Sequence, residues 1–184
     1  MANAYFYKNF HLKLLLKDQQ IQFTIKRLAN QILEDHFPFD NTVFVGLQPR
    51  GIYLSDRIVN ELREEDNSLK ILYGKLDITF YRDDVRKELH IANATDIPFS
   101  IEGKKLVLID DVLYTGRTIR AALDALMDFG RPEKVELLVL IDRRYSRQLP
   151  IQPDYTGRSI DSIITQKVKV LWKEKDGKDE VILV

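Results

Sequence analysis

The sequence predicts one α/β domain built on a central, mostly parallel sheet with helices on both faces. Two observations lead to this prediction. Continuous aliphatic runs, which are typical of strands buried on both faces, alternate with amphipathic segments along the chain. The length of 184 residues suits a single hydrophobic core, and no repeat, low-complexity tract or long linker divides the sequence. We therefore expect a single domain over residues 1–184.

The expected elements follow one another in alternating order. Apolar residues at helical spacing predict helices over residues 18–35 and 51–62, and a third from Ile119 to Phe129 that ends near Gly130. Aliphatic runs predict strands at 43–47, 106–109, 135–141, 168–172 and 181–184. Residues 71–81 form a mixed extended run, and the polar residues 83–98 predict a loop. Because ligands of parallel sheets bind at the carboxyl ends of the strands, the site is expected there.

Composition excludes several classes of function. The formal net charge is +0, so the overall charge does not indicate a nucleic-acid or membrane partner. The chain has no cysteine, which excludes disulfides and thiolate catalysis. The three histidines match no metal-ligand spacing. With no apolar run long enough to span a membrane and no signal-peptide pattern at the start, we expect a cytoplasmic protein.

The most informative stretch runs from Leu106 to Thr118. An aliphatic strand ends in two adjacent carboxylates, Asp110 and Asp111, and a short polar turn then leads into a helix. The start of a helix binds phosphate through its free N–H groups and positive dipole end. Carboxylates hold divalent metals or sugar hydroxyls. The pattern therefore indicates a phosphorylated sugar as ligand, although an ordinary strand–turn–helix crossover with solvated aspartates is the alternative.

This stretch resembles the phosphoribosyl-pyrophosphate signature of type I phosphoribosyltransferases. The resemblance implies the fold of that family, with a small hood and a flexible lid loop beside the main sheet. It also implies that Asp110 and Asp111 bind the ribose hydroxyls directly or through Mg²⁺. The 5′-phosphate would be bound by the loop that follows, comprising Tyr114, Thr115, Gly116, Arg117 and Thr118.

Two further segments resemble motifs of the same family. The segment from Leu47 to Gly51 follows a strand and opens a helix, as the family's pyrophosphate loop does. Pro49, Arg50 and Gly51 would then meet the pyrophosphate; a plain turn with a solvated arginine is the alternative. The segment 76–84 resembles the family's lid loop. Arg82 is then the candidate cation that closure of this loop would bring to the pyrophosphate; an exposed hairpin is the alternative.

The base is indicated by two other positions. Residues 153–157 resemble the base-binding hood of the family, with Tyr155 stacking on the base and Thr156 reading its edge; a core tyrosine is the alternative. Where purine salvage enzymes carry a lysine, this chain has Asp142, which argues against a purine substrate. In combination, the motifs resemble bifunctional pyrimidine operon attenuation regulators and uracil phosphoribosyltransferases. That resemblance implies a reaction of uracil with phosphoribosyl pyrophosphate.

The same resemblance implies a second activity. Members bind leader messenger RNA in response to uridine nucleotides, and the resemblance suggests a homodimer or larger homo-oligomer. Arg143, Arg144 and Arg147 form a basic cluster beside an aromatic residue, which is compatible with RNA loops; solvated surface arginines are the alternative. The cluster departs from the family pattern because it is longer and lacks a histidine. Two alternatives stay open: an RNA-binding regulator with vestigial catalysis, and a phosphoribosyltransferase for another base, a purine or orotate.

Overall fold

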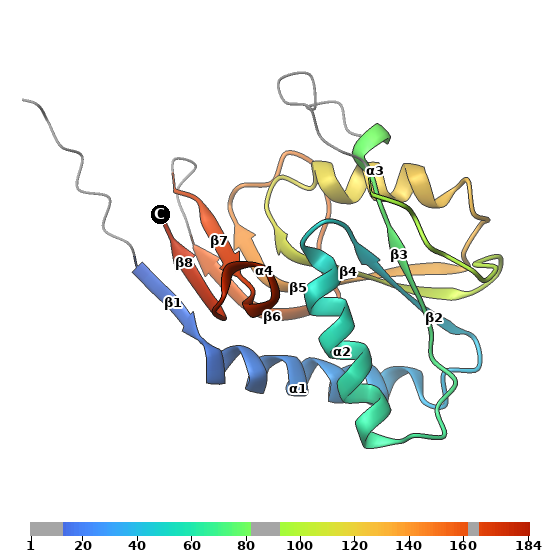
Figure 1. The fold of residues 1–184 in the computed structure, drawn as a ribbon. Helices are drawn as coiled ribbons and strands as arrows, with labels where there is room; N and C mark the ends of the chain where they lie inside the picture. Colours follow the sequence, from blue (N-terminus) through green and yellow to red (C-terminus); the bar gives the residue numbers. More distant parts are fainter. Residues whose placement is uncertain (1–12, 82–92, 162–165) are drawn as a thin grey trace, which may run out of the picture.

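The computed structural model describes residues 13–81, 93–161 and 166–184 and contains a five-stranded parallel sheet (Figure 1). The strand order is β3-β2-β4-β5-β6. The bounds are β2 Thr42–Leu47, β3 Leu72–Leu76, β4 Lys105–Leu113, β5 Lys134–Arg144 and β6 Tyr155–Asp161. All four pairings between neighbours are parallel, so the carboxyl ends of the five strands lie at one edge.

Helices cover both faces of this sheet (Figure 1). The first two, α1 (Asp18–His36) and α2 (Gly51–Glu65), pack on one face, and α3 (Arg117–Leu126) packs on the other. Side chains of the central strands alternate between the two layers, as β-geometry requires: Ile109 joins the core beneath α1 and α2, and Leu108 joins the core beneath α3. The predicted α/β fold is confirmed.

A second, smaller sheet lies beside the first. It is antiparallel, in the order β1-β8-β7, with β1 Lys13–Lys17, β7 Val168–Leu171 and β8 Glu180–Leu183. The single-turn helix α4 (Lys173–Asp176) joins β7 to β8, and the fully buried Trp172 anchors that connection. Residues 153–157, which were predicted to form the hood, do not belong to this small sheet but lie at or just before the start of β6 in the main sheet. β7 is at the edge of the small sheet.

The predicted helices and strands are all present, with three notable differences. The strand β4 continues past Ile109 through the acidic pair to Leu113. β1 and β6 were not predicted, because the aliphatic run of β1 is only three residues long and β6 has the exposed residues Arg158 and Ser159 in its middle. The mixed run 71–81 divides into β3 and a 3-10 turn, η1 (Thr79–Tyr81). No helix in the described ranges combines the length and hydrophobicity that a membrane span requires.

Candidate active site

The acidic pair lies on β4, near the carboxyl edge of the parallel sheet. Asp110 and Asp111 are both buried, with 7% and 9% of their surfaces exposed. The carboxylate of Asp110 accepts a hydrogen bond of 2.9 Å from the backbone N–H of Asp111. Both side chains therefore sit in a largely water-excluded position, where a carboxylate interacts strongly with any cation or hydroxyl that reaches it.

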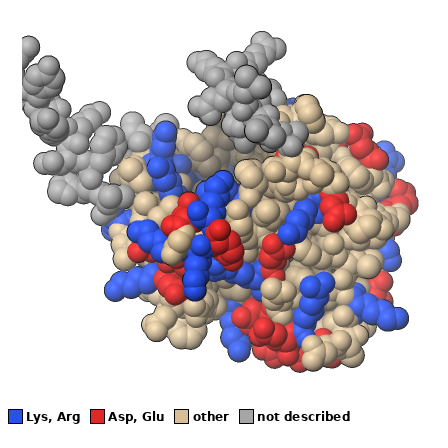
Figure 2. All heavy atoms as spheres, viewed as in Figure 1, with Lys and Arg blue, Asp and Glu red and all other residues tan. Residues whose placement is uncertain are grey.

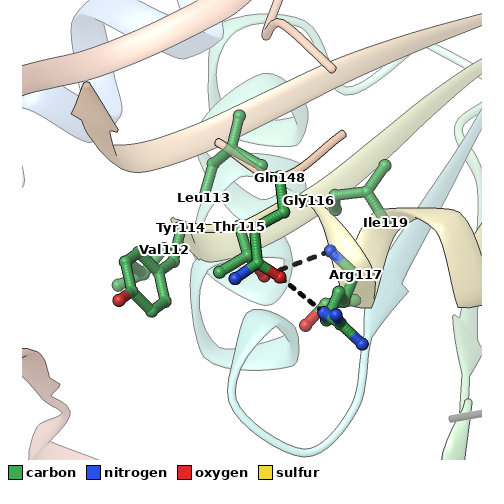
Figure 3. Close-up of a pocket in the computed structure, with 9 residues that line it drawn as sticks. Val112, Leu113, Tyr114, Thr115, Gly116, Arg117, Ile119 and Gln148 are labelled. Atoms are coloured by element: carbon green, nitrogen blue, oxygen red, sulfur yellow. Dashed lines mark hydrogen bonds between the residues drawn. The ribbon is translucent and has the colours of Figure 1, made fainter. Parts of the chain in front are cut away.

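The predicted phosphate loop wraps the start of α3 and lines a cavity of about 390 Å³ (Figure 3). Gly116 caps the helix with φ of 91°, a left-handed conformation that a residue with Cβ adopts only under strain. A Cβ there would also lie 3.1 Å from the side chain of Ile151. Tyr114, Thr115, Arg117 and Thr118 line the same cavity. The structure thus gathers all five predicted loop residues around one opening at a helix start.

Residues of the β5–β6 connection hold this loop in shape. The carbonyl of Thr115 accepts hydrogen bonds from the backbone N–H groups of Gln148 and Leu149, at 3.0 and 3.2 Å. The side chain of Gln148 accepts a hydrogen bond of 2.7 Å from Arg117 (Figure 3). Sequence reasoning missed Gln148, because nothing in its local pattern shows that this connection returns to the loop after β4.

The predicted pyrophosphate loop lies directly against the acidic pair. Gly51 begins α2, and a Cβ at this position would come within 2.8 Å of the carbonyl oxygen of Ile109 and 3.0 Å of Asp110. Only glycine lets the start of α2 approach β4 so closely. Pro49 is exposed in the turn before it, and the Arg50 side chain points toward Asp111, with Nε 3.7 Å from Oδ2. Two motifs that are distant in sequence therefore form one site.

The electrostatics of Asp111 depend on burial and on Arg50. Burial raises the pKa of Asp111 above its ordinary value of 3.8, although the Arg50 guanidinium and hydrogen bonds oppose the rise. A bound cation would favour the ionised carboxylate further. In the part of the chain that the structure describes, no group of three or more His, Cys, Asp or Glu could hold a metal ion. The ionised state of Asp111 therefore depends on nearby cations and hydrogen bonds.

A second cavity of about 460 Å³ lies between this acidic site and the small sheet. It is lined by Arg50 and Asp111 on one side and by β7 on the other. Lys167 and Val184 exchange two backbone hydrogen bonds of 2.8 Å. In an antiparallel ladder such hydrogen-bonded pairs alternate with pairs that are not hydrogen-bonded to each other. The backbone N–H and C=O groups of Val168 and Val170 therefore point away from β8, toward the free edge of β7. Sequence reasoning assigned no site residue to β7.

The predicted lid is described only at its root. Asp77 follows β3 and is buried; its carboxylate accepts hydrogen bonds from the backbone N–H groups of Thr79, at 2.8 Å, and Asn93, at 3.1 Å. Asp77 therefore joins the start of the predicted lid segment to Asn93, which lies beyond that segment. Arg82, the predicted lid cation, lies outside the described residues.

The structure does not bring Tyr155 and Thr156 to the site. Tyr155 begins β6, at the amino edge of the sheet, and is only 6% exposed. Its hydroxyl donates a hydrogen bond of 2.9 Å to Asp35 and lies 3.1 Å from His36. Thr156 pairs with β5, and its carbonyl accepts a hydrogen bond from Arg27. The prediction of a stacking tyrosine was wrong, because all amino ends of a parallel sheet lie opposite the site.

Asp142 does lie at the carboxyl edge of the sheet, but its carboxylate is already paired with an arginine. It is 9% exposed at the carboxyl end of β5, beside Leu113 of β4. Its carboxylate forms an ion pair with Arg147. Because Arg147 neutralises this carboxylate, the argument that Asp142 repels a purine oxygen loses its premise.

The arginines of the predicted RNA cluster differ in exposure. Arg143 is 4% exposed, with its guanidinium 3.8 Å from the centre of the Tyr114 ring. Arg147 donates to backbone carbonyls of the phosphate loop and of Ile151. Only Arg144 is at the surface, where it pairs with Asp161 beside Tyr145, which is 81% exposed. Two of the three predicted RNA contacts are therefore internal structural groups.

The fold and the site together define a class of protein. Residues 11–175 match the family model described as the phosphoribosyl transferase domain, and the chain belongs to that family. It is accordingly a phosphoribosyltransferase.

Relatives narrow the class further. The chain is 46% identical to the bifunctional protein PyrR of Elusimicrobium minutum over 175 residues, which cover 94% of this chain and 96% of that protein. It is 45% identical over 175 residues to the bifunctional protein PyrR of Halalkalibacterium halodurans, covering 93% and 96%. This similarity places the chain in the family of bifunctional PyrR proteins. The hypoxanthine phosphoribosyltransferase of Trypanosoma cruzi shares the fold, with a TM-score of 0.70 and 17% identity over 93% of this chain and 95% of that one.

Proposed function

We propose that the chain transfers the ribose 5-phosphate group from phosphoribosyl pyrophosphate to uracil, giving uridine monophosphate and pyrophosphate. The observation that carries the proposal is the close approach of Gly51 and Arg50 to Asp110 and Asp111, next to the loop at the start of α3. This edge of the sheet offers, side by side, groups suited to a diphosphate, to ribose hydroxyls and to a phosphate.

Each group has a separate task in that reaction. The loop 114–118 would bind the 5′-phosphate through backbone N–H groups and hydroxyls at the start of α3. Asp110 and Asp111 would accept hydrogen bonds from the ribose hydroxyls and hold the sugar in line. Arg50 would stabilise the negative charge that grows on the departing diphosphate. No nucleophile is required from the protein, because the base itself attacks the sugar.

The donor set also suits magnesium. Mg²⁺ prefers oxygen ligands and is usually bound through one or two carboxylates together with substrate phosphates. The buried pair Asp110 and Asp111 supplies that number of carboxylates. When bound, the ion would neutralise charge on the ligand's oxygens.

The base is proposed to bind in the cavity beneath β7. The backbone N–H and C=O groups of Val168 face the free edge of this strand, above Asp111 and Arg50. A pyrimidine such as uracil carries a donor and acceptors along one edge, which an edge strand can pair with as it would with another strand. The choice of uracil over other bases is supported by the sequence resemblance, since the carboxylate of Asp142 is neutralised.

The test is an assay with a panel of bases. Purified protein is incubated with magnesium and phosphoribosyl pyrophosphate, uracil, hypoxanthine, guanine or orotate is added separately, and nucleotide formation is measured. Turnover with uracil alone is the expected result. Turnover with another base would refute the assigned substrate, and no turnover with any base would favour a regulator that senses nucleotides. The double variant Asp110→Asn/Asp111→Asn should lose most turnover while folding normally.

A second proposed function is binding of leader messenger RNA, regulated by uridine nucleotides. The word "bifunctional" in the relatives' names supports it, as does the exposed pair of Arg144 and Tyr145, which offers a cation and a stacking surface. Binding should weaken steeply with salt and should fall in Arg144→Ala, while uracil turnover stays unchanged. The resemblance also supports a cytoplasmic homo-oligomer, which sedimentation of the purified protein would test.

A further inference from the structure

The guanidinium of Arg50 already has acceptors from its own chain. It donates a hydrogen bond of 2.7 Å to the carboxylate of Asp176 and another to the carbonyl oxygen of Val170. Its Nε is also near Asp111. These partners come from β4, β7 and α4, so Arg50 connects the main sheet to the small sheet. With 32% of its side chain exposed, a ligand in the adjoining cavity can still reach it.

Asp176 is held as an ionised partner for this arginine. Its Oδ2 also accepts a hydrogen bond of 2.9 Å from the backbone N–H of Trp172. That bond, together with Arg50, lowers the pKa of Asp176 below its ordinary value of 3.8. The carboxylate therefore stays negatively charged at neutral pH, and its charge faces the same guanidinium that a diphosphate would use.

An arginine within α2 holds the same turn independently of Arg50. Arg57 lies two helical turns beyond Arg50 and pairs with Glu174 and Asp179, both at 2.8 Å, with its guanidinium 4.8 Å from the centre of the Trp172 ring. Figure 2 shows the interspersed blue and red side chains where α2 meets α4. Arg57 does not line the cavity, so its pairs are not in competition with a ligand there.

We propose that Asp176 is a positioning residue that occupies Arg50 until the diphosphate of the ligand displaces it. This inference rests on the proposed function, because it assumes that Arg50 meets a diphosphate. The diphosphate carries more negative charge than one carboxylate and offers several oxygens to the planar guanidinium. Its arrival frees the α4 turn from Arg50, while Arg57 keeps the turn attached to α2. Asp176 thereby weakens the affinity of the resting site for the diphosphate.

The experiment compares Asp176→Asn with the matched control Glu174→Gln, which removes one charge from the same turn without touching Arg50. Binding of inorganic pyrophosphate and of phosphoribosyl pyrophosphate, each with magnesium, is measured by calorimetry. Because the partly exposed pair is of modest strength, Asp176→Asn should bind pyrophosphate on the order of fivefold more tightly. Glu174→Gln and the charge-restoring Asp176→Glu should bind like the wild type. In turnover, the KM for phosphoribosyl pyrophosphate should fall in Asp176→Asn without a rise in kcat.

Trp172 provides a second measurement on the unaltered protein. It is the single tryptophan of the chain, and its backbone N–H shares the Asp176 oxygen with Arg50. Pyrophosphate should therefore change its fluorescence emission. Binding without an emission change, or an unchanged or weaker affinity in folded Asp176→Asn, overturns the displacement. A wild-type protein that binds neither pyrophosphate nor phosphoribosyl pyrophosphate overturns the proposed function instead.

Discussion

Asp77 is expected to stabilise the root of the segment that precedes Asn93. Its buried carboxylate accepts three hydrogen bonds, from the backbone N–H of Thr79 at 2.8 Å and from the backbone and side-chain nitrogens of Asn93 at 3.1 and 3.2 Å. In Asp77→Asn one oxygen remains for Thr79, but an amide nitrogen cannot accept the two bonds from Asn93. A hydrogen bond to a charged group contributes roughly 1.5–3 kcal/mol, and neighbouring bonds are not fully additive. We therefore expect the free energy of unfolding to fall by about 3 kcal/mol.

Thermal unfolding measures this loss. For a chain of this size, about 3 kcal/mol corresponds to a fall in Tm of roughly 6–12 °C. The matched control is Asp66→Asn, which makes the same chemical change at a surface turn where the carboxylate is bonded by Ser68. The control should melt close to the wild type, because both Ser68 bonds go to one oxygen and the amide keeps an oxygen that can accept them. An unchanged Tm in Asp77→Asn would refute the reasoning.

The pH dependence provides an independent check. Burial would raise the pKa of Asp77, but the bonds from Thr79 and Asn93 outweigh burial and lower it below 3.8. The unfolded chain therefore takes up this proton at a higher pH than the folded protein. The stabilisation by Asp77 is complete above the unfolded pKa and is lost as the pH falls through the folded pKa. The difference between wild type and Asp77→Asn should thus stay constant from neutral pH to about pH 5 and shrink only in stronger acid.

Three further substitutions separate the site from the scaffold. Asp111→Asn should abolish turnover yet raise Tm at neutral pH, because burial raises the pKa of Asp111 and makes its ionised form destabilising there. The rise should disappear below the unfolded pKa of 3.8, and a lower Tm at neutral pH would contradict the reasoning. Gly51→Ala should cost about 1–3 kcal/mol in denaturant unfolding and reduce turnover, since its Cβ would meet the carbonyl of Ile109 at 2.8 Å. Tyr155→Phe should cost about 1–2 kcal/mol through the lost bond to Asp35 while turnover is kept; weaker base binding would return Tyr155 to the site.

The first half of the site could be predicted because its geometry is local. The acidic pair, the loop at Gly116 and the start of α3 follow one another directly, so a strand-to-helix pattern is enough to place them together. The position of Arg50 follows from one additional rule, that parallel strands end at the same edge of the sheet. Both predictions needed only the fold class and the order of elements.

The opposite wall of the cavity could not be predicted in this way. It depends on how the small sheet packs over β4, and that packing follows from long-range pairing of β1 with β8 and of α2 with the α4 turn. The segment Val168–Leu171 looks from its sequence like any short aliphatic strand. Tyr155 was misplaced for a related reason: its neighbourhood predicted an aromatic residue near a ligand, but the β6 pairing that fixes its edge was not recognised.

Arg147 shows why a cluster of charges in sequence is a weak guide to function. In the sequence it is one of three arginines beside a tyrosine, but in the structure it bonds the carbonyls of Leu113 and Tyr114, the carbonyl of Ile151 and the carboxylate of Asp142. Because these acceptors converge on it from both sides of the phosphate loop, Arg147→Ala would leave several of them unpaired and distort the loop. Such a variant would lose phosphate binding and any nucleotide-regulated RNA binding together. Arg144, which contacts only the surface residues Asp161 and Tyr145 among the described side chains, is therefore the position at which RNA binding can be tested separately from catalysis.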